Sequence, residues 1–273
     1  MKKVFTHSGM AHLDEVFAIA AISVATGEEV EVTRGFKVED ESAYDYIVDI
    51  GGKYDGKKFF DHHQGGDEVT MKSAFGLVVD SFDALEPLRD TTFVDRVDFQ
   101  DNHGPERGFE MFIGPVEKDE FFDAYEPVEQ MMLAAFASGK ESFAIEIAKE
   151  TILHRIGIEK AFEEAEENIR KATVVNIEGL NVLLQDFELV SDAKFTSVGN
   201  RVSEKFARDN CIHLIVGKGR DPEQRSLFRT IDGERRGLNL SILEGRVPFA
   251  HKNGFFAAID RKDSLEDIIK MLS

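Results

Sequence analysis

The first third of the chain alternates strand-like and helix-like segments, and this alternation constrains the fold more than any other feature. Four segments have the apolar composition of short strands: residues 3–6, 30–34, 45–50 and 58–60. Two segments carry apolar side chains at helical spacing: residues 12–25 and 73–85. Strands separated by helices favour a parallel sheet with crossover connections. The sequence therefore predicts an α/β fold, with a mainly parallel sheet and helices on both of its faces.

A charged, proline-free helical stretch near the middle of the chain indicates two domains. It covers about residues 141–171, and residues 159–171 are dense in Glu and Lys. We expect residues 156–172 to be an exposed connecting helix, because few of their side chains could pack in a core. Residues 1–155 would then form one domain. Residues 173–273, which contain further strands and two helices, would form a smaller α/β domain.

The chain is strongly acidic, with 52 Asp and Glu, 33 Lys and Arg, and a formal net charge of −19. This charge repels polyanions, so a broad basic groove for long nucleic acid is not expected. A small or short phosphorylated substrate is compatible with it, because bound divalent cations supply positive charge locally. The sequence leaves open whether the chain forms a homodimer.

Two sequence features bear on the cellular compartment. The N-terminal residues lack an apolar stretch long enough for a signal peptide, and no segment approaches the ~20 apolar residues of a membrane span. The single cysteine, Cys211, lies in the apolar run of residues 211–216, which favours a buried core thiol. We therefore expect a cytoplasmic protein that does not contact membranes.

His and Asp residues gather where the predicted strands end. His7 follows the first strand, His12 and Asp14 begin the next helix, and Asp49 ends a later strand. In an open parallel sheet the carboxyl ends of the strands form the ligand-binding edge. A buried acid at a strand end is costly unless it is paired or bound to a metal. Each residue alone has an ordinary structural explanation, so the predicted metal site rests on their joint placement.

Two further clusters extend this set. Asp61-His62-His63 can serve a single site only if their segment is a loop, which we expect, because neighbouring residues of a strand point to opposite sides. Asp98 and Asp101 share a face if their segment is helical. Imidazole and carboxylate ligands together suit Mn²⁺, Fe²⁺, Co²⁺ or Zn²⁺. Two ions about 3.5–4 Å apart can clamp the attacking and leaving oxygens of a phosphoester, and Asp49 could bridge them.

Three of these segments resemble the melanocyte-proliferating-gene family. They are residues 6–15, with His7, His12 and Asp14, residues 48–55, and residues 60–64. The family has been described as metal-dependent hydrolases and as exonucleases acting on RNA. It belongs to the wider DHH phosphoesterase superfamily, with RecJ-type nucleases, nanoRNases and family II pyrophosphatases. The near match covers roughly the first 105 residues and implies a DHH-type catalytic domain.

The resemblance implies two divalent metal ions, with Mn²⁺ as the first expectation and Mg²⁺, Co²⁺, Fe²⁺ or Zn²⁺ as alternatives. The ligands implied for one ion are His7, His12 and Asp49. The ligands implied for the other are Asp14, Asp49, His62 and either Asp98 or Asp101. Two catalytic residues are also implied: Asp61 would orient an imidazole, and His63 would face the leaving group or phosphate as a general acid.

The last third of the chain resembles the DHH-associated domain more loosely. Residues 226–230 are similar to its substrate-binding strand, and residues 249–255 to its Gly-His loop. The resemblance implies that Arg229, His251 and Gly254 bind substrate, with the Arg229 guanidinium holding phosphate or carboxylate. The alternative for Arg229 is an ion pair with one of the many acids of the chain.

Three departures from the superfamily pattern keep other functions open. His12 stands where many members have an acid, His103-Gly104 follow Asn102 where a glycine is expected directly, and a glycine-rich GGGH loop is missing. The first hypothesis is a metal-dependent phosphoesterase that cleaves phosphodiester bonds of short oligonucleotides or related small phosphoesters. The alternatives are a pyrophosphatase or phosphomonoesterase, and a protein that binds metal and ligand without turnover.

Overall fold

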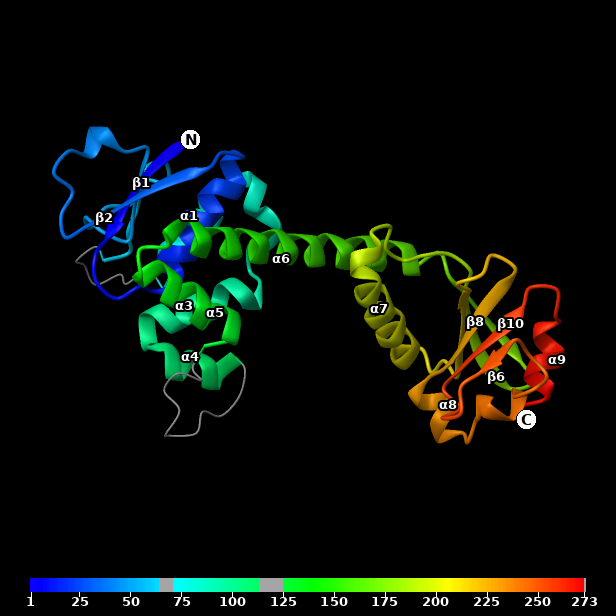
Figure 1. Cartoon of the computed structure of the whole chain (residues 1–273). Coiled ribbons are helices and arrows are strands. Elements are labelled where there is room, and N and C mark those ends of the chain that lie inside the picture. Colours follow the sequence, from blue (N-terminus) through cyan, green and yellow to red (C-terminus); the bar gives the residue numbers. More distant parts are fainter. Residues whose placement is uncertain (64–70, 113–124, 273) are drawn as a thin grey trace. The chain divides into compact units, whose positions relative to one another are not determined.

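The computed structural model describes residues 1–63, 71–112 and 125–272 of the chain (Figure 1). The chain divides into two compact units, residues 1–157 and residues 158–273. The boundary lies inside helix α6, Glu141–Ile169, and the predicted connecting segment overlaps the second half of this helix.

Unit 1 contains a short sheet and several helices. Its strands are β1 (Lys2–His7), β2 (Val30–Gly35), β3 (Tyr46–Val48) and β4 (Phe59–Phe60). Its α-helices before α6 are α1 (Leu13–Thr26), α2 (Ala74–Ser81), α3 (Thr92–His103), α4 (Pro105–Phe112) and α5 (Pro127–Ala137). The strand order is β2-β1-β3-β4, and the three strand pairs are parallel, as the sequence predicted.

The helices that pack on this sheet lie on one face. Val4, Val48 and Phe60 share a hydrophobic core with α1 and α2, and these two helices also contact each other. The opposite face carries Phe5 and Ile47, and the Tyr44 ring packs against Phe5 with 5.0 Å between ring centroids. The predicted arrangement with helices on both faces is therefore not found in the described part of unit 1, where Tyr44, from the segment before β3, packs on the second face.

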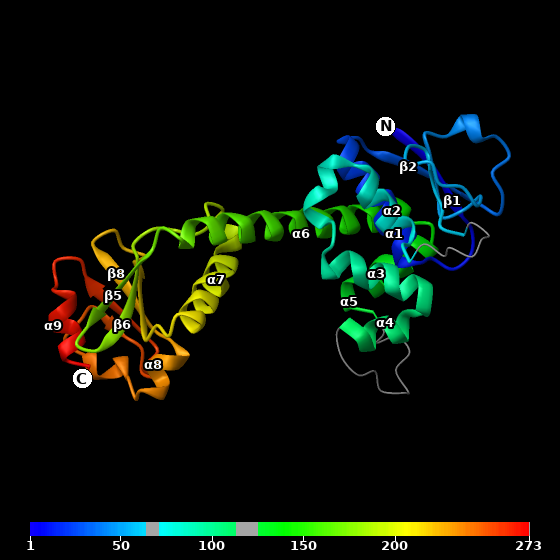
Figure 2. The same cartoon turned by 180° about the vertical axis from the view of Figure 1, so that it is seen from behind.

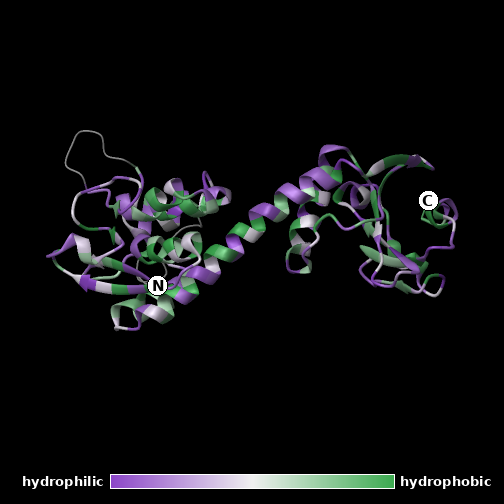
Figure 3. Cartoon of the chain, turned by 90° about the horizontal axis from the view of Figure 1, so that it is seen from above, coloured by the Kyte–Doolittle hydropathy of each residue, from purple (hydrophilic) through white to green (hydrophobic). Residues whose placement is uncertain are grey.

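Helix α6 is less exposed than the sequence suggested. Its first half contributes Ala144, Ala148 and Ile152 to the core of unit 1, at the four-residue spacing of one helical face. Its second half contributes Ala161 and other apolar residues to a core of unit 2. Figure 3 shows hydrophilic and hydrophobic residues interspersed along this helix. Its apolar side chains pack only in part, because Phe143 and Leu153 are exposed.

Unit 2 is built on a mixed sheet (Figure 2). Its strands are β5 (Thr173–Ile177), β6 (Leu180–Gln185), β7 (Leu214–Lys218), β8 (Gln224–Arg229), β9 (Phe249–Ala250) and β10 (Phe256–Asp260). The strand order is β5-β6-β7-β8-β10-β9, and β6 and β7 are parallel while the other pairs are antiparallel. The helices after α6 are α7 (Thr196–Asp209), α8 (Ile231–Arg235) and α9 (Leu265–Lys270). No helix in the described parts of the chain has the length and apolarity that crossing a membrane requires.

The prediction of a buried thiol at Cys211 was wrong. Cys211 is exposed, and its φ of 52° places it in the left-handed region. Strand β7 begins only at Leu214, so Cys211 belongs to the turn after α7 and not to the apolar strand that follows it. The apolar run indicated a strand correctly but did not show where the strand starts.

Candidate metal centre

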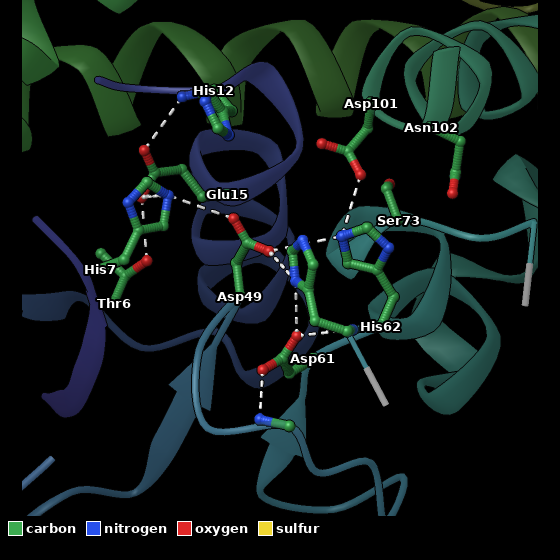
Figure 4. A network of polar contacts seen from close by, with 12 residues as sticks. Thr6, His7, His12, Glu15, Asp49, Asp61, His62, Ser73, Asp101 and Asn102 are labelled. Atoms are coloured by element: carbon green, nitrogen blue, oxygen red, sulfur yellow. Dashed lines mark hydrogen bonds and ion pairs between the residues drawn. The ribbon is translucent and has the colours of Figure 1, made fainter. Parts of the chain in front are cut away.

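Several of the predicted His and Asp residues gather at the carboxyl edge of the sheet in unit 1, and Figure 4 shows His7, His12, Asp49, Asp61, His62 and Asp101 there. His7 is the last residue of β1, Asp49 directly follows β3, and Asp61-His62-His63 directly follow β4 in an irregular segment. Helix α1 starts at Leu13 and therefore brings His12 and Asp14 to the same edge. Because parallel strands end on one side of a sheet, these residues converge although they are far apart in sequence.

Three groups of side chains at this edge could hold metal ions. In each group, one potential ligand atom per residue lies within 4.8 Å of the others. The groups in the described residues are His7–His12–Asp49, Asp49–His62–His63 and His12–Asp14–Asp101. Asp49 and His12 each belong to two groups, so the three form one continuous cluster. The structure thus brings together the residues that the sequence suggested as ligands, with the exception of Asp98.

Asp49 lies at the centre of the cluster. Its Oδ2 is 3.2 Å from Nε2 of His7, and its Oδ1 is 3.6 Å from Nε2 of His62. Nε2 of His62 is also 3.0 Å from Oδ2 of Asp101. Asp49 has a φ of 53°, an uncommon conformation for a residue other than glycine. This backbone turn directs the carboxylate of Asp49 between the two imidazoles, where it could bridge two ions.

Buried polar atoms without hydrogen bonds provide the physical test of whether metals fit. In the described residues these atoms are Nε2 of His7, both carboxylate oxygens of Asp14, Oδ1 of Asp49, Nε2 of His62 and Oδ2 of Asp101. The atoms of His7, Asp49, His62 and Asp101 contact opposite charges at 3.0–3.6 Å without forming hydrogen bonds. A buried polar group without a hydrogen bond costs about 1–3 kcal/mol, and a charged one costs more. All six atoms belong to one cluster, and their mixed imidazole and carboxylate character suits Mn²⁺, Fe²⁺, Co²⁺ or Zn²⁺. The donor set therefore fits divalent cations.

The protonation states of the metal-free cluster reflect the crowding of these acids. Burial raises the pKa of Asp14 well above 3.8, and the nearby Asp49 and Asp101 raise it further. Burial would also raise the pKa of Asp49, but His62 and His7 outweigh it and lower this pKa to about 2. Without a bound cation, the folded protein therefore disfavours the charged form of Asp14.

The two imidazoles beside Asp49 behave as bases. The close contact with the carboxylate of Asp49 raises the pKa of His7 to about 9, against the effect of burial. Burial lowers the pKa of His62, but Asp101 and Asp49 raise it to about 10. The pKa of His12, in contrast, is lowered by burial and by the neighbouring His7. His7 and His62 must therefore lose a proton when they bind a cation, whereas the charged form of His12 is already disfavoured.

The structure distinguishes between the two acids of helix α3. Asp101 belongs to the cluster, but Asp98 accepts hydrogen bonds from the backbone N (3.0 Å) and Oγ (2.6 Å) of Ser73. Burial raises the pKa of Asp98 to about 6, although the bonds from Ser73 oppose it. Asp98 therefore anchors the start of α2 and belongs to none of the potential metal groups in the described residues, so its suggested role as a ligand is not supported.

Asp61 and His63 interact with each other. Oδ1 of Asp61 is 2.9 Å from Nδ1 of His63 and also accepts the backbone N–H of that residue. The other oxygen of Asp61 accepts the N–H of Gly52. The side chain of His63 is 65% exposed, in contrast to His62. Asp61 thus fixes the ring of His63 at the open side of the cluster, an arrangement compatible with the orienting role expected for it.

Sequence reasoning assigned no role to Glu15, Arg34 or Tyr125. Glu15 is fully buried beside His7 and Arg34 contacts the segment after β1. Tyr125 lines a pocket together with His12, Asp14, Gln100 and Asp101. Burial, followed by Glu129 and the acids of the cluster, raises the pKa of Tyr125 to about 12. For Glu15 alone the sequence offered a signal: it lies three residues after His12 at the start of a helix, a spacing typical of a helix-capping acid.

The proposed substrate residues lie in unit 2. Arg229 donates to the backbone O of Leu238 (2.9 Å) and pairs with Glu234 (2.8 Å), which is the ion-pair alternative considered for it. Nδ1 of His251 accepts the N–H of Asn253, and its ring lies 4.5 Å from that of Phe255. Gly254 has a φ of 67°, and a Cβ there would clash with Oδ1 of Asn239. Each residue thus has a structural role within unit 2, and their substrate contacts stay a prediction.

Comparison with known proteins identifies relatives of the N-terminal segment. Residues 3–85 match the model of a family described as an uncharacterised protein family (UPF0160), named for MYG1 exonucleases. The MYG1 protein YER156C of Saccharomyces cerevisiae is 41% identical over 75 residues, which are 27% of this chain and 22% of the relative. The MYG1 exonuclease of Bos taurus is 37% identical over 73 residues, 26% of this chain and 19% of the relative. These matches span about a fifth of each relative. They confirm the resemblance to the melanocyte-proliferating-gene (MYG1) family in this segment.

A solved structure was also compared with the whole chain. It is titled as a DHH domain from a member of a family of ribosomal proteins, and it is 13% identical. The comparison covers 99% of this chain and 85% of that one, with a TM-score of 0.29. A likeness at this level carries no argument about fold or function.

Proposed function

We propose that this chain is a metal-dependent phosphoesterase that hydrolyses phosphodiester bonds of short oligonucleotides or related small phosphoesters. The observation that carries the proposal is the set of buried polar atoms without hydrogen bonds, all of which belong to one cluster of His and Asp side chains. The relatives named MYG1 exonucleases support hydrolysis of a phosphodiester as the reaction class. The acidic composition favours a short substrate over long nucleic acid.

The side chains divide into those that hold cations and those that handle protons. His7, His12 and Asp49 would hold one cation, and the second would be held by Asp14, Asp49, His62 and Asp101. Two divalent cations, Mn²⁺ by first expectation, would supply charge to both oxygens of the scissile bond and lower the pKa of an attacking water.

We propose that His63 transfers a proton. Asp61 accepts a hydrogen bond from Nδ1 of His63, which leaves Nε2 of this exposed ring for a substrate. A neutral imidazole with a proton on Nδ1 can accept a proton at Nε2, and a charged one can donate it to the leaving oxygen. Asp61 therefore acts through His63, and its removal should weaken proton transfer more than cation binding.

The test is hydrolysis of bis(p-nitrophenyl) phosphate by the full chain with Mn²⁺. We expect turnover that EDTA abolishes and that Asp101→Asn lowers by at least about 10²-fold, because a ligand is lost. Asp95→Asn is the matched control, since Asp95 lies exposed on the same helix and should leave activity unchanged. A panel of a dinucleotide, a phosphomonoester and pyrophosphate then defines the substrate class.

Two results would contradict the proposal. If the purified protein hydrolyses none of these substrates with Mn²⁺, Mg²⁺, Co²⁺, Fe²⁺ or Zn²⁺, it is not a phosphoesterase, and tight cation binding without product would indicate a binding protein. If the monoester or pyrophosphate is cleaved and the dinucleotide is not, the phosphodiester specificity is wrong.

A further inference from the structure

Arg34, near the end of β2, contacts the backbone at the start of the segment that runs from His7 to His12. Its Nε donates to the carbonyl of His7 and its Nη2 to the carbonyl of Gly9, each at 3.2 Å. Its Nη1 donates to the carbonyl of Phe136 in α5 at 3.4 Å, and its guanidinium lies 4.8 Å from the centre of the Phe136 ring. The planar fork of arginine can make these bonds at once, whereas a lysine ammonium cannot reproduce this geometry.

Glu15 connects the same segment to the start of helix α1. It is fully buried, and its Oε2 accepts the hydroxyl of Thr6 at 2.9 Å and lies 3.4 Å from Nε2 of His7. Its Oε1 accepts the N–H of His12 at 3.0 Å and lies 3.8 Å from Arg34. Thr6, His12 and Glu15 are drawn together in Figure 4. A helix-capping role explains the bond to His12 alone. It does not explain a buried carboxylate that also contacts Thr6 and borders His7.

These contacts fix the two imidazoles of the first cation site relative to each other. Residues 8–11 between His7 and His12 include Gly9, whose φ is 117°, so this backbone has access to conformations that other residues disfavour. Arg34 holds the carbonyls of His7 and Gly9, and Glu15 holds the N–H of His12. The ring centroids of His7 and His12 are 5.3 Å apart, which allows both to reach one cation only while the segment keeps its shape.

We propose that Glu15 and Arg34 are positioning residues that pre-form the His7–His12 half of the metal centre, and that they determine its affinity for the first cation without binding the cation themselves. The inference rests on the proposed metal centre. Residues that support metal ligands typically change affinity by about 10–100-fold when they are replaced. Replacing Glu15 or Arg34 should change the affinity for the cation bound by His7 and His12, because both residues contact the segment that carries these two ligands.

The chain offers a matched control for Arg34. Arg89 also donates to three backbone carbonyls, those of Val79, Asp80 and Phe82, at 3.1–3.4 Å, and it lies in unit 1 away from the cluster. Arg34→Lys and Arg89→Lys therefore remove the same kind of contact at different places. The role of Glu15 is tested through Thr6. Thr6→Val removes the hydroxyl that donates to Oε2 of Glu15, and Thr6→Ser, which keeps a hydroxyl, is its control.

The experiment measures Mn²⁺ affinity of the full chain by isothermal titration calorimetry and the unfolding temperature in EDTA for each variant. We expect Arg34→Lys and Thr6→Val to weaken one Mn²⁺ site, the one assigned to His7 and His12, by about 10–100-fold. Arg89→Lys and Thr6→Ser should bind Mn²⁺ within about twofold of the unmodified chain. Both arginine variants should unfold at a lower temperature in EDTA, so stability alone would not separate them.

Two results would overturn the inference. Unchanged Mn²⁺ affinity in Arg34→Lys would show that the segment keeps its shape without the arginine. An equal loss in Arg89→Lys would show that affinity follows general stability. If instead the unmodified chain binds no Mn²⁺, the metal centre itself is refuted, which is a different outcome from either of these.

Discussion

Replacing Asp14 with asparagine should stabilise the metal-free protein and remove its response to metal. The carboxylate of Asp14 is fully buried, neither of its oxygens has a hydrogen-bond partner among the described residues, and two other acids of the cluster lie nearby. Asparagine keeps the shape of the side chain, removes the charge, and gives a donor that can face Asp49 or Asp101. Relief of an unsatisfied buried polar group is worth about 1–3 kcal/mol.

The expected size follows from unit 1, which spans residues 1–157. One kcal/mol shifts the unfolding temperature of a domain of this size by about 3 °C, so Asp14→Asn should raise it by about 3–9 °C in EDTA. With Mn²⁺ at 100 times its dissociation constant, the unmodified chain should gain about 2.7 kcal/mol, or roughly 8 °C. Asp14→Asn should lose most of this gain, because a ligand is missing.

The assay is calorimetric unfolding of both proteins in EDTA and in Mn²⁺, with Asp95→Asn as the exposed control on α3. The pH dependence adds a second readout. Because the pKa of Asp14 is raised in the folded state, the folded protein binds its proton more tightly than the unfolded chain does. Stability linked to Asp14 is therefore present at low pH and is lost as pH rises above 3.8. The reasoning is refuted if Asp14→Asn unfolds at a lower temperature in EDTA, or if it keeps the full gain with Mn²⁺.

Two further predictions concern protons and packing. In the metal-free protein the pKa of His7 is about 9 and that of His62 about 10, so their contribution to stability is present below 6.5 and is lost as pH rises through these values. Cation binding at pH 7.5 should therefore release roughly two protons, and titration heats that do not vary with buffer ionisation enthalpy would contradict this. Gly76→Ala should destabilise the protein by about 1–3 kcal/mol, because its Cβ would clash with the buried carboxylate of Asp98. Gly217→Ala, whose Cβ would meet only the carbonyl of Gln185 at 3.7 Å, is the control, and equal denaturant midpoints for the two variants would contradict the prediction.

The sequence was sufficient to predict the cluster but not all of its members. Strand ends could be recognised from local composition, and the topology of a parallel sheet brings such ends together, so Asp49 and His62 could be expected near His7. Asp98 and Asp101 could not be separated, because helical spacing gives both the same face. What separates them is Ser73, a tertiary neighbour that binds Asp98.

Other features depend on long-range packing that local patterns do not contain. The contacts of Arg34 with the segment after β1 and with α5 join residues that are far apart in sequence. The second face of the sheet in unit 1 lacks a packed α-helix among the described residues, and Phe5 on this face packs against Tyr44 in the segment before β3. A buried strand has an apolar sequence whether a helix or a loop covers it. The sequence alone therefore could not show that only one face of the sheet carries helices.

The most direct measurement is the anomalous X-ray signal of Mn²⁺ in crystals of the full chain. Two peaks about 3.5–4 Å apart are expected at the carboxyl edge of the sheet in unit 1, with Asp49 between them. His7 and His12 should coordinate one ion, and His62 and Asp101 the other. A map without a peak at this cluster, or with manganese bound only by other residues, would contradict the proposal that these side chains form a metal centre.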